Sequence, residues 1–522
     1  MGGYDLHHDP ETELEVLIRA RYPLLYIVSW EEERIEAALR RVAARRRKRL
    51  FAWTLTEGIV AIDAPQPVRV DPGALTPMQA LEHVEGSREA ALFLLKDFHP
   101  FLGGSQALEN ARLIRKLRDL ARRLKRWEKA VIFLSPLLRL PPELERDVTV
   151  LDWSLPTMAD LEEALDRVIR SARVRGDLRL KLDEATRERI LKAAQGLTIS
   201  EAERVFARSV VMTRDLDIGV IVAEKQQIIR KSGILEYLEP QERMEYVGGL
   251  SELKDWLNKR RLAFTEEARR FGLPEPRGVL LLGVPGGGKS LIAKATASLW
   301  QLPLLRLDMG RVFDQMVGSS EENIRRALHL AERVSPAILW MDELEKGLAG
   351  TASSHLSDAG TAARVFSSFL VWLQEKTAPV FVVATSNDIS LLPPEILRKG
   401  RFDEIFFVDL PDQEERQEIF AIHLARRRRD PARFDLVRLA QESEGFSGAE
   451  IEQVVISALY DAFERGRELT EEDLLRNIAH TVPLSQTMRE RVTALRNWAY
   501  THARMASGRR PVPTGVGPSS LY

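Results

Sequence analysis

The sequence Gly283-Val284-Pro285-Gly286-Gly287-Gly288-Lys289-Ser290 decides the fold of the C-terminal half of this chain. It fits the pattern G-x-x-x-x-G-K-[ST]. The apolar run Gly278–Leu282 precedes it, and the helical pattern Leu291–Leu299 follows it. Glycines let the backbone curl so that N–H groups face an anion, and the N-terminus of the following helix attracts negative charge. The stretch therefore predicts a phosphate-binding loop between a strand and a helix of an α/β domain.

Polar residues follow two further predicted strands. Ile338–Met341 ends in Asp342 and Glu343, and Asn387 comes shortly after Val380–Ala384. Two acids at a strand end are common in surface turns, and an asparagine after a strand is a common turn former. Because both segments follow a phosphate-binding loop along the chain, we interpret them as catalytic. Glu343 would polarise an attacking water as general base, and the Asn387 amide would hydrogen-bond that water or a phosphate.

The same residues predict the ligands ATP and Mg²⁺. Lys289 would contact the β- and γ-phosphates, and Ser290 and Asp342 would hold the metal. Arg398 and Arg401 precede another predicted strand. An arginine beside a nucleotide stabilises charge on the transferring phosphoryl group, but two solvated arginines in a loop are the simpler reading. Their spacing alone leaves both open.

These motifs and their order resemble the AAA ATPases, in the clade of the proteasomal ATPases and the membrane-anchored AAA proteases. The resemblance covers about Met244 to Pro483. Tyr246–Leu250 is similar to the clade's adenine-packing motif, and Leu397–Phe402 is similar to its region that ends in two arginine fingers. Gly445–Ile451 resembles its lid motif, with Glu450 where aspartate is usual.

The resemblance implies a ring, usually a hexamer, in which Arg398 and Arg401 reach the nucleotide of a neighbouring subunit. It also implies a histidine near the nucleoside, and it places Ala449 where other clades have a sensor arginine. The nucleotide-binding residues that it implies are Val247, Gly248, Val284, Pro285, Gly286, Gly287, Gly288, Lys289, Ser290, Leu291, His423, Gly448 and Ala449.

One segment departs from the pattern of ring translocases. Such rings grip polypeptides with an aromatic-hydrophobic-glycine loop, and the matching residues here are Met316, Val317 and Gly318. Methionine can still hold apolar side chains, although less rigidly than an aromatic ring. Met316 could equally pack against a neighbouring subunit, so threading of a substrate stays open.

Across its whole length the chain is most similar to the AAA ATPases encoded as a hypothetical reading frame in plastids, which have cyanobacterial and other bacterial relatives. The segments that carry this similarity are Lys225–Gly233, Trp340–Gly347 and Pro483–Ser485.

The chain also repeats a pattern. Gly196–Glu203 matches Gly445–Glu452 in spacing, which favours two related modules over chance similarity. In the first module the apolar run Leu24–Ser29 continues into Trp30-Glu31-Glu32-Glu33, and acids there would repel phosphate. We therefore predict a degenerate AAA-like α/β domain without a phosphate loop (1–160), a helical subdomain and linker (161–240), an active AAA α/β domain with a parallel sheet between helices (241–411), a helical lid (412–486), and a C-terminal helix and flexible tail (487–522).

Composition limits the partners. The 522 residues carry 76 basic and 77 acidic side chains, a net charge of −1, and no cysteine. Basic runs at Arg40–Arg49 and Arg426–Arg429 close predicted helices, where cations favour the helix dipole, so nucleic acid is not favoured. Neither a signal peptide nor a membrane span is predicted, and a cytoplasmic location is expected.

Three functions stay open on sequence grounds. The first is a homo-oligomeric ATPase that remodels a protein client which the sequence does not identify. The second is a regulatory switch or scaffold without polypeptide threading, and the third is an ATPase recruited to nucleic acid. Lys289, Glu343, Asn387, Arg398 and Arg401 together favour true hydrolysis.

Overall fold

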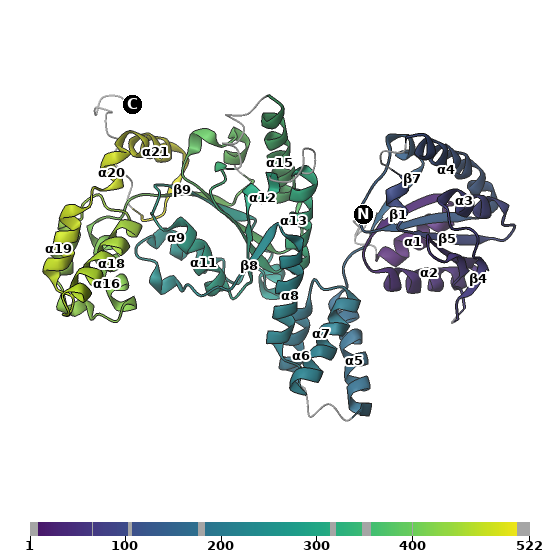
Figure 1. The fold of residues 1–522 in the computed structure, drawn as a ribbon, viewed down its shortest axis with the longest axis horizontal. Coiled ribbons are helices and arrows are strands. Elements are labelled where there is room, and N and C mark those ends of the chain that lie inside the picture. The colour runs from purple at the N-terminus through teal and green to yellow at the C-terminus, as the bar shows by residue number, and fades with distance from the viewer. Residues whose placement is uncertain are drawn as a thin grey trace. The chain divides into compact units, whose positions relative to one another are not determined.

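The computed structural model describes residues 9–64, 66–102, 107–175, 183–313, 320–346, 356–398 and 400–508. The chain forms two compact units, Met1–Ile221 and Val222–Tyr522, with the boundary inside helix α8 (Ile218–Ser232). Figure 1 labels helices and strands of both units. The predicted grip residues Met316, Val317 and Gly318 lie outside the described residues.

The first unit contains a largely parallel sheet with the order β4-β3-β2-β5-β6-β1-β7. Its strands are β1 (Leu24–Val28), β2 (Arg49–Thr54), β3 (Gly58–Ala61), β4 (Val68–Asp71), β5 (Ala91–Lys96), β6 (Ala130–Ser135) and β7 (Val148–Asp152). The antiparallel strands β3 and β4 extend one edge. The apolar run Leu24–Ser29 forms β1, whereas no strand was predicted at β3 or β4.

Helices cover both faces of this sheet (Figure 1). They are α1 (Pro10–Arg19) and α2 (Glu32–Arg46) on one face, and α3 (Pro77–Gly86) and α4 (Ala107–Trp127) on the other. Side chains alternate along β1, so Leu25 and Ile27 pack with α1 and α2 while Leu24 and Tyr26 pack with α3 and α4. This is the three-layer arrangement that buried parallel strands require.

A helical block follows the first sheet. It consists of α5 (Met158–Arg175), α6 (Glu184–Ala194), α7 (Ile199–Thr213) and α8. Thr198 caps α7, and Glu201 completes a capping box with it.

The second unit contains the sheet β14-β13-β9-β12-β11-β10-β8. Its strands are β8 (Leu235–Leu238), β9 (Gly278–Gly283), β10 (Leu304–Leu307), β11 (Ala337–Met341), β12 (Val380–Ser386), β13 (Glu404–Val408) and β14 (Arg504–Met505). Strand β8 runs antiparallel to β10, in a stretch that the sequence interpretation left as linker.

Helices cover both faces of the second sheet as well. Helices α9 (Ser251–Lys259) and α11 (Lys289–Trp300) pack on one face, and α13 (Ser320–Val334), α15 (Leu356–Glu375) and α21 (Arg489–His502) contribute to the core on the other. The short helices α10 (Glu266–Phe271) and α12 (Met309–Phe313) lie in the connections.

The two sheets share the order of five mutually parallel strands. The order is β2-β5-β6-β1-β7 in the first sheet and β10-β11-β12-β9-β13 in the second. Each sheet is followed by helices of which at least one begins with a Thr or Ser cap in a capping box. The predicted fold class is therefore confirmed: an α/β module without a phosphate loop, then an α/β module with one and a helical lid.

The lid consists of α16 (Gln413–Arg426), α17 (Leu436–Glu442), α18 (Gly448–Glu464) and α19 (Glu471–His480). Helix α20 (Leu484–Thr487), α21 and β14 then return to the α/β domain, where β14 pairs with β13. This return was not predicted. Within the described part of the chain, no helix is long and apolar enough to cross a membrane.

Candidate functional site

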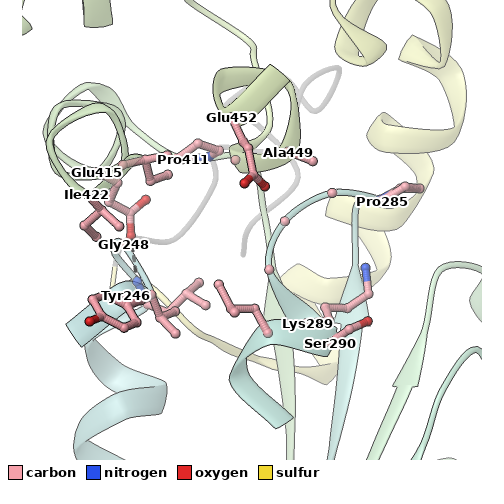
Figure 2. A pocket seen from close by; sticks show the side chains of 18 of the residues that line it. Tyr246, Gly248, Pro285, Lys289, Ser290, Pro411, Glu415, Ile422, Ala449 and Glu452 are labelled. Carbon is pink, nitrogen blue, oxygen red and sulfur yellow. Dashed lines mark hydrogen bonds between the residues drawn. The ribbon is translucent and has the colours of Figure 1, made fainter. Parts of the chain in front are cut away.

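A cavity of about 520 Å³ lies where the glycine-rich loop, the ends of β11 and β12, and the lid meet in the second unit. Its volume falls within the range of small-molecule sites. Figure 2 shows Lys289 and Ser290 on one side of it and Ala449 and Glu452 of α18 across from them. The predicted residues that line it are Val247, Gly248, Pro285, Gly286, Gly287, Gly288, Lys289, Ser290, Leu291, Asp342, Glu343, Asn387, His423, Gly448 and Ala449.

The loop begins where the fully buried strand β9 ends. Gly286 has φ +76°, and a Cβ there would stand 2.8 Å from Ser447 Oγ and 3.1 Å from Ala449 Cβ. A glycine is therefore required for this backbone and for the close approach of the lid. The Gly286 carbonyl accepts a hydrogen bond of 3.2 Å from Ala449 N–H, which joins the loop to the first turn of α18.

Lys289 is buried, with 6% of its surface exposed. Its Nζ donates to the carbonyls of Gly283 (2.9 Å) and Val284 (2.8 Å), both within the loop. Burial lowers the pKa of Lys289 to about 8, against the opposing charges of Glu345, Asp342 and Glu343. The ammonium is thus held at the floor of the loop, where phosphate oxygens would provide stronger, charged acceptors.

Ser290 and Asp342, the predicted metal ligands, lie next to each other. Ser290 Oγ donates to Asp342 Oδ1 over 3.1 Å, and Thr385 Oγ1 donates to the same oxygen over 2.7 Å. A hydroxyl and a carboxylate that converge in a phosphate-binding cavity are the oxygen ligands that Mg²⁺ prefers. These residues fit the metal, which when bound would neutralise charge on the phosphates.

Glu343 and Asn387 also meet. Asn387 Nδ2 donates to Glu343 Oε1 over 3.2 Å, and the other Glu343 oxygen pairs with Lys346. Glu343 has φ +50°, and its N–H donates to Thr385 Oγ1 over 2.9 Å. A non-glycine residue in the left-handed region is uncommon and often marks a functional site. The carboxylate is held at the cavity wall, where a general base for an attacking water would lie.

The segment before α9 lies against α16 of the lid. Gly249 N–H donates to Glu418 (2.8 Å), and Leu250 N–H donates to Glu415 (3.0 Å). A Cβ on Gly248 would stand 2.5 Å from Ile419 Cγ1, so this contact requires glycine. The region that the sequence likened to an adenine-packing motif therefore does border the cavity.

His423 lines the same end of the cavity. Its Nδ1 lies 3.6 Å from Glu452 Oε1, and Arg427 pairs with that oxygen at 2.8 Å. Burial lowers the pKa of His423, partly opposed by Glu452, which favours a neutral ring. A neutral imidazole can both donate and accept hydrogen bonds.

Of the predicted site residues that the structure describes, three do not line the cavity: Val284, Arg398 and Arg401. Val284 is fully buried beneath the loop. Arg398 is exposed, and Arg401 is partly so. Their segment is fixed at its far end, because Oδ2 of Asp403 accepts hydrogen bonds from the N–H groups of Arg277 (2.8 Å) and Gly278 (2.9 Å).

Several lining residues were not among the individually predicted site residues. They are Glu242, Tyr246, Leu250, Thr385, Asp409, Pro411, Glu415, Ile419, Ile422, Arg426 and Glu452. Tyr246 and Leu250 belong to a motif that was quoted, and Glu452 ends the repeated pattern. Thr385 and Asp409 follow the rule that polar residues at the ends of parallel strands face the site.

Two family models match separate parts of the second unit. The model "ATPase family associated with various cellular activities (AAA)" matches residues 279–410, and the AAA+ lid domain matches residues 433–476. The N-terminal and second domains of SpoVK-like AAA ATPases match residues 10–153 and 159–232.

Similar proteins span nearly the whole chain. The AAA domain-containing protein Ycf46 of Trieres chinensis is 42% identical over 506 residues, 95% of this chain and 98% of that protein. Ycf46 of Pyropia yezoensis is 40% identical over 93% of this chain and 97% of its own length. The proteasome-activating nucleotidase of Aeropyrum pernix is 35% identical over 218 residues, 40% of this chain and 52% of that protein. With its phosphate loop, paired acids and lid around one cavity, the chain belongs to the AAA family of ATP-hydrolysing enzymes, among the Ycf46 AAA domain-containing proteins.

Proposed function

We propose that this ATPase works as a homo-oligomeric ring, a hexamer, and that hydrolysis drives the remodelling of a protein client in the cytoplasm. One observation carries the ring: Lys289, Asp342 and Glu343 line the cavity, whereas Arg398 and Arg401 do not. The arginines are exposed or partly exposed and available to another subunit. Arg426 does line the cavity but pairs with Glu242, so a neighbour would supply the arginine that stabilises the transferring phosphoryl group.

Within that site each residue has one task. The loop N–H groups and Lys289 bind the phosphates, and Ser290 and Asp342 hold Mg²⁺. Glu343 accepts a proton from the attacking water, while Asn387 fixes the orientation of the carboxylate. Arg398 and Arg401 of the neighbouring subunit stabilise the charge that develops on the transferred phosphoryl group.

Similarity to another ATPase supports a protein client. The similar protein from Aeropyrum pernix is described as a nucleotidase that activates a proteasome, and it shares the ATPase part of this chain. The residues Met316, Val317 and Gly318 remain our candidates for contact with a client.

Binding of nucleic acid is not favoured, because arginines of both basic runs form ion pairs with acidic side chains. Arg41 and Arg45 pair with Glu11, and Arg46 pairs with Glu15. In the lid, Arg426 pairs with Glu242. The second candidate is a switch whose ATP state controls assembly; the tie between Gly286 and Ala449 favours it, since the lid contacts the phosphate loop directly.

The test uses the full-length Glu343→Gln protein. Loss of the base should lower turnover by about 10²–10⁴-fold while ATP binding persists, so rings and client complexes accumulate. ATPase rates are measured in parallel with unfolded protein and with RNA. Stimulation by unfolded protein and its retention on Glu343→Gln support remodelling. ATP-dependent assembly without either effect favours the switch, and stimulation by RNA alone overturns the proposal.

A further inference from the structure

Glu345 is a buried acid that the site described above does not use. It follows Asp342, Glu343 and Leu344 after β11, and it exposes only 7% of its surface. It is not among the residues that line the cavity. A carboxylate in such a place is costly unless it is hydrogen-bonded, so its partners indicate its role.

One oxygen of Glu345 has a specific partner. Oε1 accepts a hydrogen bond of 2.9 Å from the backbone N–H of Asn387. The buried Oε2 has no hydrogen-bond partner among the described residues. Hydrogen bonds to an ionised acceptor are about twice as strong as neutral ones, so this contact fixes the main chain of Asn387 firmly.

Asn387 connects this contact to the site. Its side-chain amide donates to Glu343 Oε1 over 3.2 Å, while its backbone N–H is held by Glu345. Thr385, two residues earlier, holds the backbone N–H of Glu343. The carboxylate of Glu343 is thus held from two sides, directly by Asn387 and through its main chain by Thr385.

We propose that Glu345 is a positioning residue for ATP hydrolysis, acting through Asn387 on the carboxylate of Glu343. This inference rests on the proposed roles of Glu343 and Asn387. Glu345 itself does not line the cavity. The negative charge of Glu345 also attracts the Lys289 ammonium and raises the pKa of Lys289, against the lowering effect of burial. The positive charge of Lys289 in turn stabilises the buried Glu345 carboxylate.

The test is a double-mutant cycle on the full-length protein, with kcat and the dissociation constant for ATP measured separately. Glu345→Ala should lower kcat about tenfold to hundredfold and change ATP affinity less than about threefold. In an Asn387→Ala background the same substitution should cost little more, because residues that act as a unit are not additive. Glu345→Gln keeps an oxygen that can accept from Asn387 N–H and should recover most of kcat.

The control is Glu332→Ala, which removes another carboxylate of the same unit, one that accepts from Trp372 Nε1 (2.8 Å). It should leave kcat unchanged. The inference is overturned if Glu345→Ala keeps parental kcat, if it lowers kcat by the same factor in both backgrounds, or if Glu345→Gln folds with parental melting temperature yet is as slow as Glu345→Ala. If Glu343→Gln or Asn387→Ala hydrolyses ATP at the parental rate, the proposed site roles fail instead, which separates the two outcomes.

Discussion

Oε1 of Glu31 accepts a hydrogen bond of 2.9 Å from the backbone N–H of Ile199, the first residue of α7. Glu31 is the third residue after β1, and Gly286 is the third residue after the matching strand β9. Gly286 holds the start of α18 through its carbonyl, whereas Glu31 holds the start of α7 through its side chain. A negative charge at a helix N-terminus is favourable, so the first unit fixes its helix without a phosphate.

The first prediction follows from this contact. Glu31 is buried, and its other oxygen pairs with Arg34 at 2.7 Å. Glu31→Ala should lower the free energy of unfolding of the first unit by about 1–3 kcal/mol, because Ile199 N–H and Arg34 lose a charged partner. Denaturant unfolding measures the loss, and hydrogen exchange in α7 should rise with it. Glu33→Ala, at an exposed neighbour, should change neither. Unchanged exchange in α7 would show that the contact does not hold the helix.

The second prediction is that Arg398 acts on the nucleotide of a neighbouring subunit. Arg398→Ala should lower ATP turnover by about 10³-fold or more and keep ATP affinity, because the residue lies outside its own cavity. Lys289→Ala should abolish binding but keep a functional arginine. Mixing the two inactive proteins should therefore restore part of the activity, measured as phosphate release. Mixing Arg398→Ala with the Arg398→Ala/Lys289→Ala double variant should not. Equal recovery in both mixtures would contradict a site shared between subunits.

Sequence reasoning found the residues whose position depends on local pattern. Asp342, Glu343 and Asn387 each follow a strand of a parallel sheet, and strands that run in the same direction bring such residues to one edge. The loop Gly283–Ser290 needs backbone conformations with positive φ, and its glycines indicate this in the sequence. These parts of the site need no knowledge of distant contacts.

Other features of the fold and the site depend on contacts between distant residues, which the sequence pattern does not predict. Strand β14 is two residues long and gains its pairing only when the C-terminal segment returns to β13. Glu31 was interpreted as one of a run of acids that repel phosphate, yet it is turned inward to Ile199. Glu345 looks like one more charge after a strand, and only its burial distinguishes it.

The third prediction is a pH dependence of the lid. The Asp473 side chain has no exposed surface, and Arg467 pairs with both of its oxygens at 2.6 and 2.7 Å. Hydrogen bonds from Arg467 hold the pKa of Asp473 well below its usual range. A carboxyl with a lowered folded pKa contributes its full stability above the unfolded pKa of about 4, and this contribution is lost as the pH falls below that value.

Asp473→Asn should therefore unfold more easily than the parent at neutral pH, and the difference should narrow as the pH falls below about 4. The stability difference is measured by denaturant unfolding at a series of pH values, with hydrogen exchange in α18 and α19 as the local probe. Glu464→Gln alters an exposed acid of the same lid and should show no such trend. A stability difference that stays constant from pH 7 to pH 2 would contradict the assigned ion pair.

The fourth prediction concerns Arg496 of α21. Its Nε lies 2.9 Å from both carboxylate oxygens of Asp409. Asp409 follows β13 and lines the cavity, so its charge would repel the phosphates of a nucleotide if it were not neutralised. The returning C-terminal segment thereby contributes to the electrostatics of the site without lining it.

Arg496→Ala should weaken ATP binding about threefold to tenfold, the effect of one unpaired charge near a partly solvated site, and high salt should reduce the effect. Calorimetric titration at two salt concentrations measures it. Arg491→Ala breaks a similar pair with Asp388 at 2.6 Å, but Asp388 does not line the cavity, so affinity should hold. Adding Asp409→Asn to Arg496→Ala removes the unpaired charge and should restore binding. If the double variant stays weak, Arg496 supports the site through the packing of α21 rather than through its charge.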